Sequence, residues 1–270
     1  MWTVFAETLK ESINRRVALA LIVVSVFFLV IQVGFTSFER GPGGELMVRR
    51  FHAATAANAR TFVVTEARTE QVTLLAGLWV MLSLFAATPL LTSYMEKGWV
   101  ELLLSKGTPR WQVLAGRYGG AIALFAGTAV IMNVLSVVYF SFRAGVPLRP
   151  YLLAVSVVAL SFISSLSLMA LISTAQANAA LLVLIVFLET IVSRVLRERK
   201  QMYGMITAKW VQWSLDWLYR ILPKHEDLNG IARSIAMGRP VDDWFPLWTT
   251  ALFTLAASAW AFYRFSRKDF

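Results

Sequence analysis

The 39 residues from Pro150 to Leu188 carry no formal charge, and no other feature limits the possible folds of this chain so strongly. At a rise of ~1.5 Å per residue, a helix of that length is far longer than a hydrocarbon core of ~30 Å. The run therefore predicts two membrane spans that are joined at its most polar point, Thr174 to Asn178. A hydrophobic content of 57% and a mean hydropathy of +0.61 agree with an integral membrane protein.

Apolar runs elsewhere in the chain bring the expected number of spans to six. We predict an all-α membrane protein, a single transmembrane domain over residues 1–270, with spans at about 17–38, 71–95, 118–142, 150–173, 177–194 and 244–263. Pro89 in the second span removes one backbone hydrogen bond. Gly119, Gly120 and Gly127 in the third span allow a neighbouring helix to approach closely.

The N-terminal segment has apolar residues at helical spacing, with polar residues on the other side. It predicts a helix that lies in the membrane interface, the alternative being a frayed tail; the apolar residues are Trp2, Phe5, Ala6, Leu9 and Ile13. Glu7 and Glu11 precede the first apolar run and no small-residue cleavage pattern closes it, so we expect this span to remain in the mature protein.

Two connections between spans are long and polar. Glu39 to Glu70 begins with a Gly-Pro-Gly-Gly turn and includes an Ala- and Thr-rich stretch that could be helical, and its His52 is expected to be a surface residue. Arg194 to Asp243 places Trp210, Trp213, Trp217 and Ile221 on one helix face, with a second helix expected over Leu228 to Met237. We predict that the tryptophan helix lies on the outer membrane surface as a gate or docking element, or else packs on span five as a plain structural helix.

Candidate chemistry inside the membrane is limited to Glu189. An acid within a span is a candidate for a functional site, although a carboxylate near the headgroups or bonded to a neighbouring helix would fit the sequence as well. There is no Walker-type phosphate loop, nucleophile elbow or two-histidine metal motif, and no cysteine. We therefore expect no enzyme activity, no metal and no cofactor bound by this chain. The net charge of +10 is spread between apolar runs, which favours membrane lipids over nucleic acid as partners.

The connection between spans two and three has the clearest design. Gly107 can adopt the left-handed conformation that ends a helix, Thr108 can cap the next helix, and Pro109 suits its first turn. We predict that one short helix ends near Ser105 and another begins at Pro109. The first helix combines apolar residues with charged ones, a composition suited to docking at a membrane surface.

This connection resembles the second intracellular connection of type-2 ABC exporter permeases. The resemblance lies in an acid at the end of a span, Gly98, the run Glu101-Leu102-Leu103-Leu104-Ser105, a proline-bearing turn, and an Arg-aromatic-Gln sequence that leads into the next span. It extends more weakly to the number and spacing of the spans. The resemblance implies a coupling helix that contacts a separate ATPase subunit, with site residues Glu96, Lys97, Gly98, Glu101, Ser105, Lys106, Gly107, Thr108 and Arg110.

The same resemblance implies the assembly and its location. ATP and Mg would be used by the partner ATPase, and two copies of the chain would form a homodimer with the transport path between them. The protein would lie in the inner (cytoplasmic) membrane with both termini in the cytoplasm. The positive-inside rule counts against this orientation, with 10 Lys and Arg inside and 16 outside. That rule weakens for long connections, and the resemblance decides the orientation.

Two other functions remain open from the sequence. A related machine could pass force to an extracytoplasmic protein, or support its assembly, without export. A membrane-bound enzyme acting on lipids would need a cluster of polar residues at one depth, which the sequence lacks.

Overall fold

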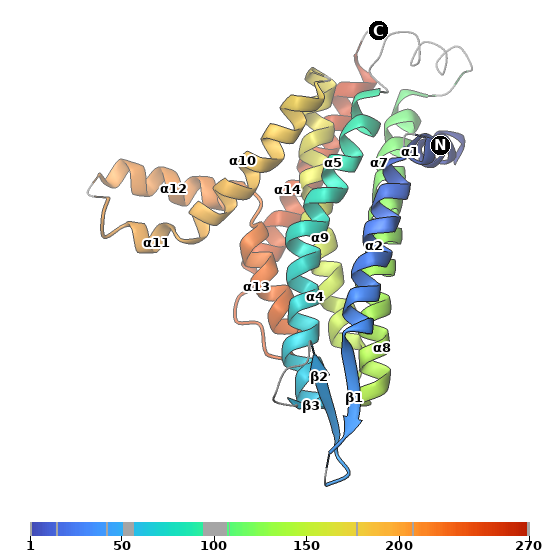
Figure 1. Ribbon diagram of the computed structural model, residues 1–270. Helices are drawn as coiled ribbons and strands as arrows, with labels where there is room; N and C mark the ends of the chain where they lie inside the picture. Colours follow the sequence, from blue (N-terminus) through green and yellow to red (C-terminus); the bar gives the residue numbers. More distant parts are fainter. Residues whose placement is uncertain are drawn as a thin grey trace.

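The computed structural model describes residues 2–14, 16–41, 43–50, 57–93, 107, 109–176, 178–206 and 208–268. Six helices in this part of the chain are long and apolar enough to cross a membrane, which confirms the predicted all-α membrane fold. They run alternately up and down in one bundle (Figure 1). Their bounds are Val17–Gly34, Ala59–Ser93, Arg110–Ala144, Arg149–Ala175, Ala179–Arg197 and Phe245–Ser266.

The second and third of these helices are much longer than expected, since each has 35 residues. At ~1.5 Å per residue they reach ~52 Å, well beyond a ~30 Å hydrocarbon core. Both helices begin before the predicted span starts at 71 and 118, because polar residues continue them outside the apolar window. Each helix contains π-helical turns between its α-helical parts: α3 (Ala59–Thr61), η1 (Phe62–Ala67), α4 (Arg68–Leu74), η2 (Leu75–Trp79) and α5 (Val80–Ser93), then α7 (Arg110–Ala129), η3 (Val130–Val134) and α8 (Leu135–Ala144).

A small sheet lies in the polar connection after span one, for which the sequence predicted only a turn and a stretch that could be helical. Helix α2 (Val17–Gly34) ends four residues before the predicted Phe38, and β1 (Thr36–Arg40) then pairs antiparallel with β2 (Leu46–Arg50), which pairs with β3 (Ala57–Asn58). The turn uses Gly44 with φ +78°, a backbone conformation that suits glycine. Val48 of the sheet is buried against Phe62 and Phe140 on the extended ends of the long helices.

Helix α9 (Arg149–Ala175) lies at the centre of the bundle. It packs against α5, α14 (Phe245–Ser266) and α13 (His225–Ala236). The rings of Phe125 and Phe162 stack with centroids 4.2 Å apart, and buried Trp79 donates to Thr128 Oγ1 across 3.2 Å. These contacts join spans two, three and four.

Spans four and five are joined by the tight turn that the sequence predicts. Helix α10 (Ala179–Arg197) begins after Asn178, whose side chain accepts hydrogen bonds from the backbone N–H groups of Ala180 at 2.9 Å and Leu181 at 3.3 Å. Beyond α10, the chain forms α11 (Arg199–Met202) and α12 (Lys209–Ile221) and returns to the bundle as α13. Figure 1 shows α11 and α12 extending sideways from the bundle as an arm.

Candidate functional site

The predicted coupling connection is described only at its end. Gly107 has φ +74°, the left-handed conformation expected there. Helix α7 begins at Arg110, and Pro109 is its N-cap; we expected Pro109 one position later, in the first turn of the helix. The other predicted coupling residues lie outside the described residues: Glu96, Lys97, Gly98, Glu101, Ser105, Lys106 and Thr108.

Hydrogen bonds join the helix ends around this connection. The Arg110 guanidinium donates to the backbone carbonyl oxygens of Lys268 and, at 3.4 Å, Ser266, and the Lys268 ammonium donates to Thr174 O across 2.9 Å. Burial lowers the pKa of Lys268, and so does the nearby positive charge of Arg264. The start of α7 and the ends of α9 and α14 therefore form one connected platform.

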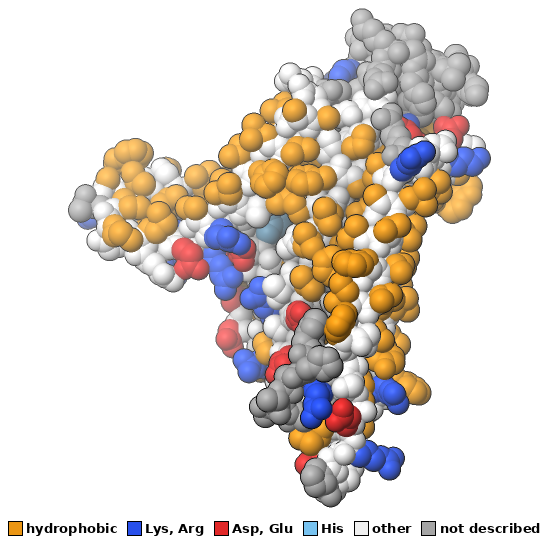
Figure 2. Space-filling model, viewed as in Figure 1, with side chains coloured by type: hydrophobic (Ala, Val, Ile, Leu, Met, Phe, Trp, Pro, Cys, Tyr) orange, Lys and Arg blue, Asp and Glu red, His pale blue; other side chains and the backbone are white. Residues whose placement is uncertain are grey.

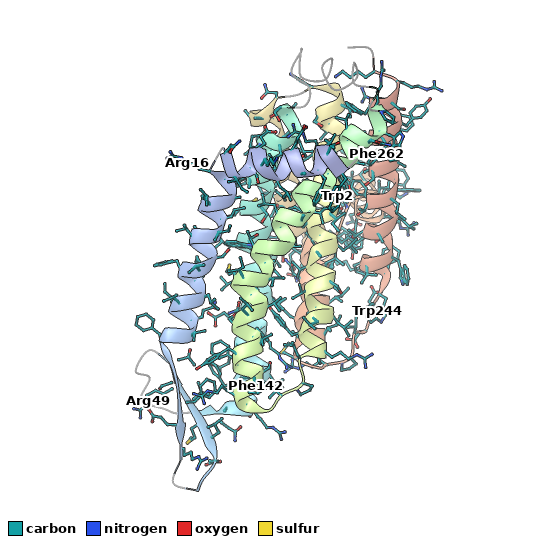
Figure 3. All side chains as sticks on the ribbon, turned by 90° about the vertical axis from the view of Figure 1, so that its right-hand side faces the viewer. Trp2, Arg16, Arg49, Phe142, Trp244 and Phe262 are labelled. Atoms are coloured by element: carbon teal, nitrogen blue, oxygen red, sulfur yellow. The ribbon has the colours of Figure 1, made fainter. Side chains whose placement is uncertain are left out.

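The N-terminal helix α1 (Trp2–Asn14) lies across the same end of the bundle (Figure 3). It packs on α7 where Gly116 and Gly120 leave room. A Cβ atom added at Gly116 would lie 2.7 Å from Val4 Cβ, and one added at Gly120 would lie 2.6 Å from Thr8 Cγ2. Glycine is thus required at both positions for the helices to approach as closely as they do.

Helix α1 packs on the bundle through a face other than the apolar face that is visible in its sequence. Val4, Thr8 and Ser12 are buried, whereas Trp2 and Ile13 are 74% and 52% exposed. Trp2 and Ile13 are therefore free to contact lipid, as expected of an interfacial helix, whereas Phe5, Ala6 and Leu9 of the same face are half-buried.

A buried ion pair also holds α1 on α7, and sequence reasoning missed it. The Arg117 guanidinium, 1% exposed, donates to a carboxylate oxygen of Glu11. Helical spacing could not reveal this pair because the two residues are far apart in sequence. Since an unpaired buried charge is costly, the pair makes the position of α1 specific.

Glu189 in span five does have a partner, His225 at the start of α13. Glu189 Oε1 lies 2.9 Å from His225 Nε2, and the two side chains are 7% and 13% exposed. Ser165 Oγ on α9 lies 3.3 Å from the same nitrogen. These contacts link α9, α10 and α13. Of the alternatives given for Glu189, they match a carboxylate that is bonded to a neighbouring helix.

Two cavities lie beside this pair. One of about 290 Å³ is lined on its polar side by Ser161, Ser165, Thr190 and His225 and on its other side by span two, including the π-helical turn η2. The second, of about 210 Å³, is almost entirely apolar and borders Glu189. A polar and an apolar space that meet at one hydrogen-bonded pair could admit an amphiphile. Among the described residues, no group of three His, Asp or Glu side chains could hold a metal ion.

The tryptophan helix is present as α12, and none of its residues is buried. Trp210, Trp213 and Trp217 are 74%, 65% and 46% exposed. The helix extends sideways from the bundle, and α13 is the helix of this connection that packs on the core (Figure 1). This position favours contact with the membrane interface over a cap on the bundle end.

A comparison with known protein families shows which family the chain belongs to. The family described as ABC-2 family transporter protein matches residues 2–270, nearly the whole chain. A comparison with curated proteins found no match. Members of this family are transmembrane subunits that work with an ABC ATPase. The chain therefore belongs to the ABC-2 transporter family and is a multi-pass membrane permease component of an ABC transporter.

Proposed function

We propose that this chain is the permease subunit of an exporter-type ABC transporter and converts ATP hydrolysis by a separate subunit into substrate movement. ATP and Mg are used by that ATPase, which docks on the connection between Ser93 and Arg110. The docking residues are those of the predicted coupling helix, from Glu96 to Arg110. Apolar residues supply the contact area, and Glu101, Lys106 and Arg110 set its register.

One observation carries this proposal. The helix ends that flank the coupling connection, the amphipathic helix α1 and the end of α14 share one end of the bundle (Figure 1). A subunit that docks there would contact a platform joined by hydrogen bonds and by the Arg117–Glu11 pair. Movement imposed on that platform would reach spans three, four and six together.

The proposed assembly is a homodimer with two ATPases in the inner (cytoplasmic) membrane, and both termini face the cytoplasm. The two cavities beside Glu189 and His225 lie on spans two, four and five and offer a place for an amphiphilic substrate.

A force-transmitting machine is the second candidate. The ~52 Å helices extend beyond the bilayer on the side away from α1 and carry the sheet β1–β3, which offers a surface for an extracytoplasmic protein. Substrate-dependent ATPase activity in vesicles is expected of an exporter. A force-transmitting machine would instead respond to the partner protein.

The proposed orientation predicts which single cysteines are labelled from outside. The chain has no cysteine, and Glu45 in the β-hairpin and Glu7 on α1 are both exposed. We expect an impermeant maleimide to label Glu45→Cys in intact cells and to label Glu7→Cys only after the membrane is opened. Labelling of Glu7→Cys in intact cells would show that the orientation is inverted.

A further inference from the structure

A cavity of about 840 Å³ lies where the arm meets the bundle, away from the Glu189–His225 pair. Its walls come from α10, α11, α12 and the start of α14. Four cations and two acids line it: Arg197, Arg199, Lys200, Arg220, Asp216 and Asp243. Figure 2 shows positive and negative side chains gathered below the apolar surface of the arm.

Two of the four cations are already neutralised by acids. The Arg199 guanidinium donates to Asp216 across 2.9 Å, and Arg197 lies 3.6 Å and 3.7 Å from the carboxylates of Glu226 and Asp227. Lys200 and Arg220 are different. Within the described part of the chain, neither has a carboxylate at ion-pair distance, and the Arg220 guanidinium lies over the Trp217 ring at 5.9 Å. Asp243 also lines the cavity, and the four cations and two acids of the lining leave an excess of positive charge for a ligand.

A further cation, Lys224, lies behind Tyr219 and Phe245, two side chains that line the cavity. It is 2% exposed, and its ammonium donates to Leu222 O at 3.2 Å and Thr249 Oγ1 at 2.9 Å. It also lies 4.8 Å and 5.3 Å from the rings of Tyr219 and Phe245, both of which line the cavity. Burial lowers the pKa of Lys224 to about 8, and the negative charge of Asp227 offsets this effect only in part. An anion in the cavity would add negative charge near Lys224 and stabilise its charged form further.

The depth of the cavity points to the lipid headgroup region. Helix α14 has Trp244 and Trp248 at its start and Trp260 and Tyr263 near its end, all 46–66% exposed. Trp244 and Tyr263 are separated by ~29 Å along the helix, which matches the thickness of a hydrocarbon core. Figure 3 places Trp244 at the end of α14 opposite Phe262, which lies level with α1. The first pair of aromatic residues thus marks one membrane interface. Phe245 and Thr249, which line the cavity, lie within about two helical turns of it on α14, whereas α12 lies closer to the level of α1 (Figure 1).

We propose that this cavity binds the phosphate of an anionic phospholipid, with Lys200 and Arg220 as its direct partners and Lys224 as a buried source of positive potential. Lysine and arginine donate to phosphate oxygens in charge-assisted hydrogen bonds. The acyl chains lie against the exposed apolar side chains of Trp217, Trp248 and Leu252. A bound lipid would join the arm to α14 and fix the arm in the plane of the membrane.

The experiment is isothermal titration calorimetry on the full chain, purified in detergent and freed of native lipid. The titrants are dioctanoyl phosphatidylglycerol, dioctanoyl phosphatidylcholine and glycerol phosphate. We expect saturable binding of phosphatidylglycerol, with phosphatidylcholine and glycerol phosphate each at least about tenfold weaker. The first lacks net negative charge and the second lacks acyl chains.

The double variant Lys200→Gln with Arg220→Gln should weaken phosphatidylglycerol binding at least about tenfold. Both side chains are exposed, so the fold should be retained. The matched control is Lys209→Gln with Arg239→Gln, which removes two exposed cations of the same connection that do not line the cavity, and it should bind as the wild type does. Equal binding of phosphatidylcholine, or an unaffected double variant, would overturn the site. Glycerol phosphate binding as tightly as phosphatidylglycerol would overturn its assignment to a lipid.

Discussion

Replacing Gly120 with leucine should displace α1 from the bundle and sharply reduce the amount of folded protein. Even the Cβ atom would lie 2.6 Å and 2.8 Å from two carbons of Thr8, and backbone on both helices would have to shift to accept the rest of the side chain. Overpacking of this kind costs about 1–3 kcal/mol or more. The displaced helix would also take Glu11 away from buried Arg117 and leave that charge unpaired.

The measurement is the yield and the thermal transition of the purified chain in detergent. Gly127→Leu on the same helix is the control, because no described atom lies within 4 Å of a Cβ added there and the residue is exposed. We expect Gly127→Leu to retain its yield and its transition temperature. Equal behaviour of the two variants would mean that α1 does not depend on this close approach.

Reversing the charge of Glu101 should uncouple the permease from its ATPase while leaving the permease folded in the membrane. If the segment docks in a groove of the ATPase, Glu101 is paired at the interface, and loss of one partner of a buried pair costs about 2–5 kcal/mol. An exposed charge would cost little, so a solvated loop would tolerate the change. The readouts are pull-down of the ATPase and ATP turnover in membranes.

Glu45→Lys is the matched control for Glu101→Lys. It makes the same change of charge on an exposed residue of the β-hairpin, at the end of the bundle opposite α1. We expect this control to retain pull-down and turnover. The docking assignment fails if Glu101→Lys and Lys106→Glu both give wild-type values.

The spans could be predicted because each depends on a local property, the length of an apolar run. Their ends could not, since the long helices continue past the apolar runs on residues such as Arg68. This arginine is buried and donates to Ser141 on α8 and to Pro147 in the loop that follows α8. The β-hairpin did leave a local signal in the Gly-Pro-Gly-Gly turn between two short runs. The sheet that it forms is stabilised by packing on Phe62 and Phe140, which is a tertiary effect.

The candidate sites show the same division. Gly107 was predicted from chemistry that is local to one turn, and its φ of +74° agrees. The partner of Glu189 is 36 positions away, and only the fold brings His225 to it. Gly120 was recognised as a position of close approach, but neither the sequence of span three nor that of α1 indicates that Thr8 packs against it.

The most direct test of the central claim is purification of the tagged chain from native membranes in mild detergent, followed by identification of the bound proteins. We predict that an ATPase subunit with its own phosphate loop co-purifies in equal amount, two copies to two copies of the chain, and that the complex hydrolyses ATP. A chain that purifies without any ATPase and with no ATP turnover would contradict a permease driven by a separate subunit.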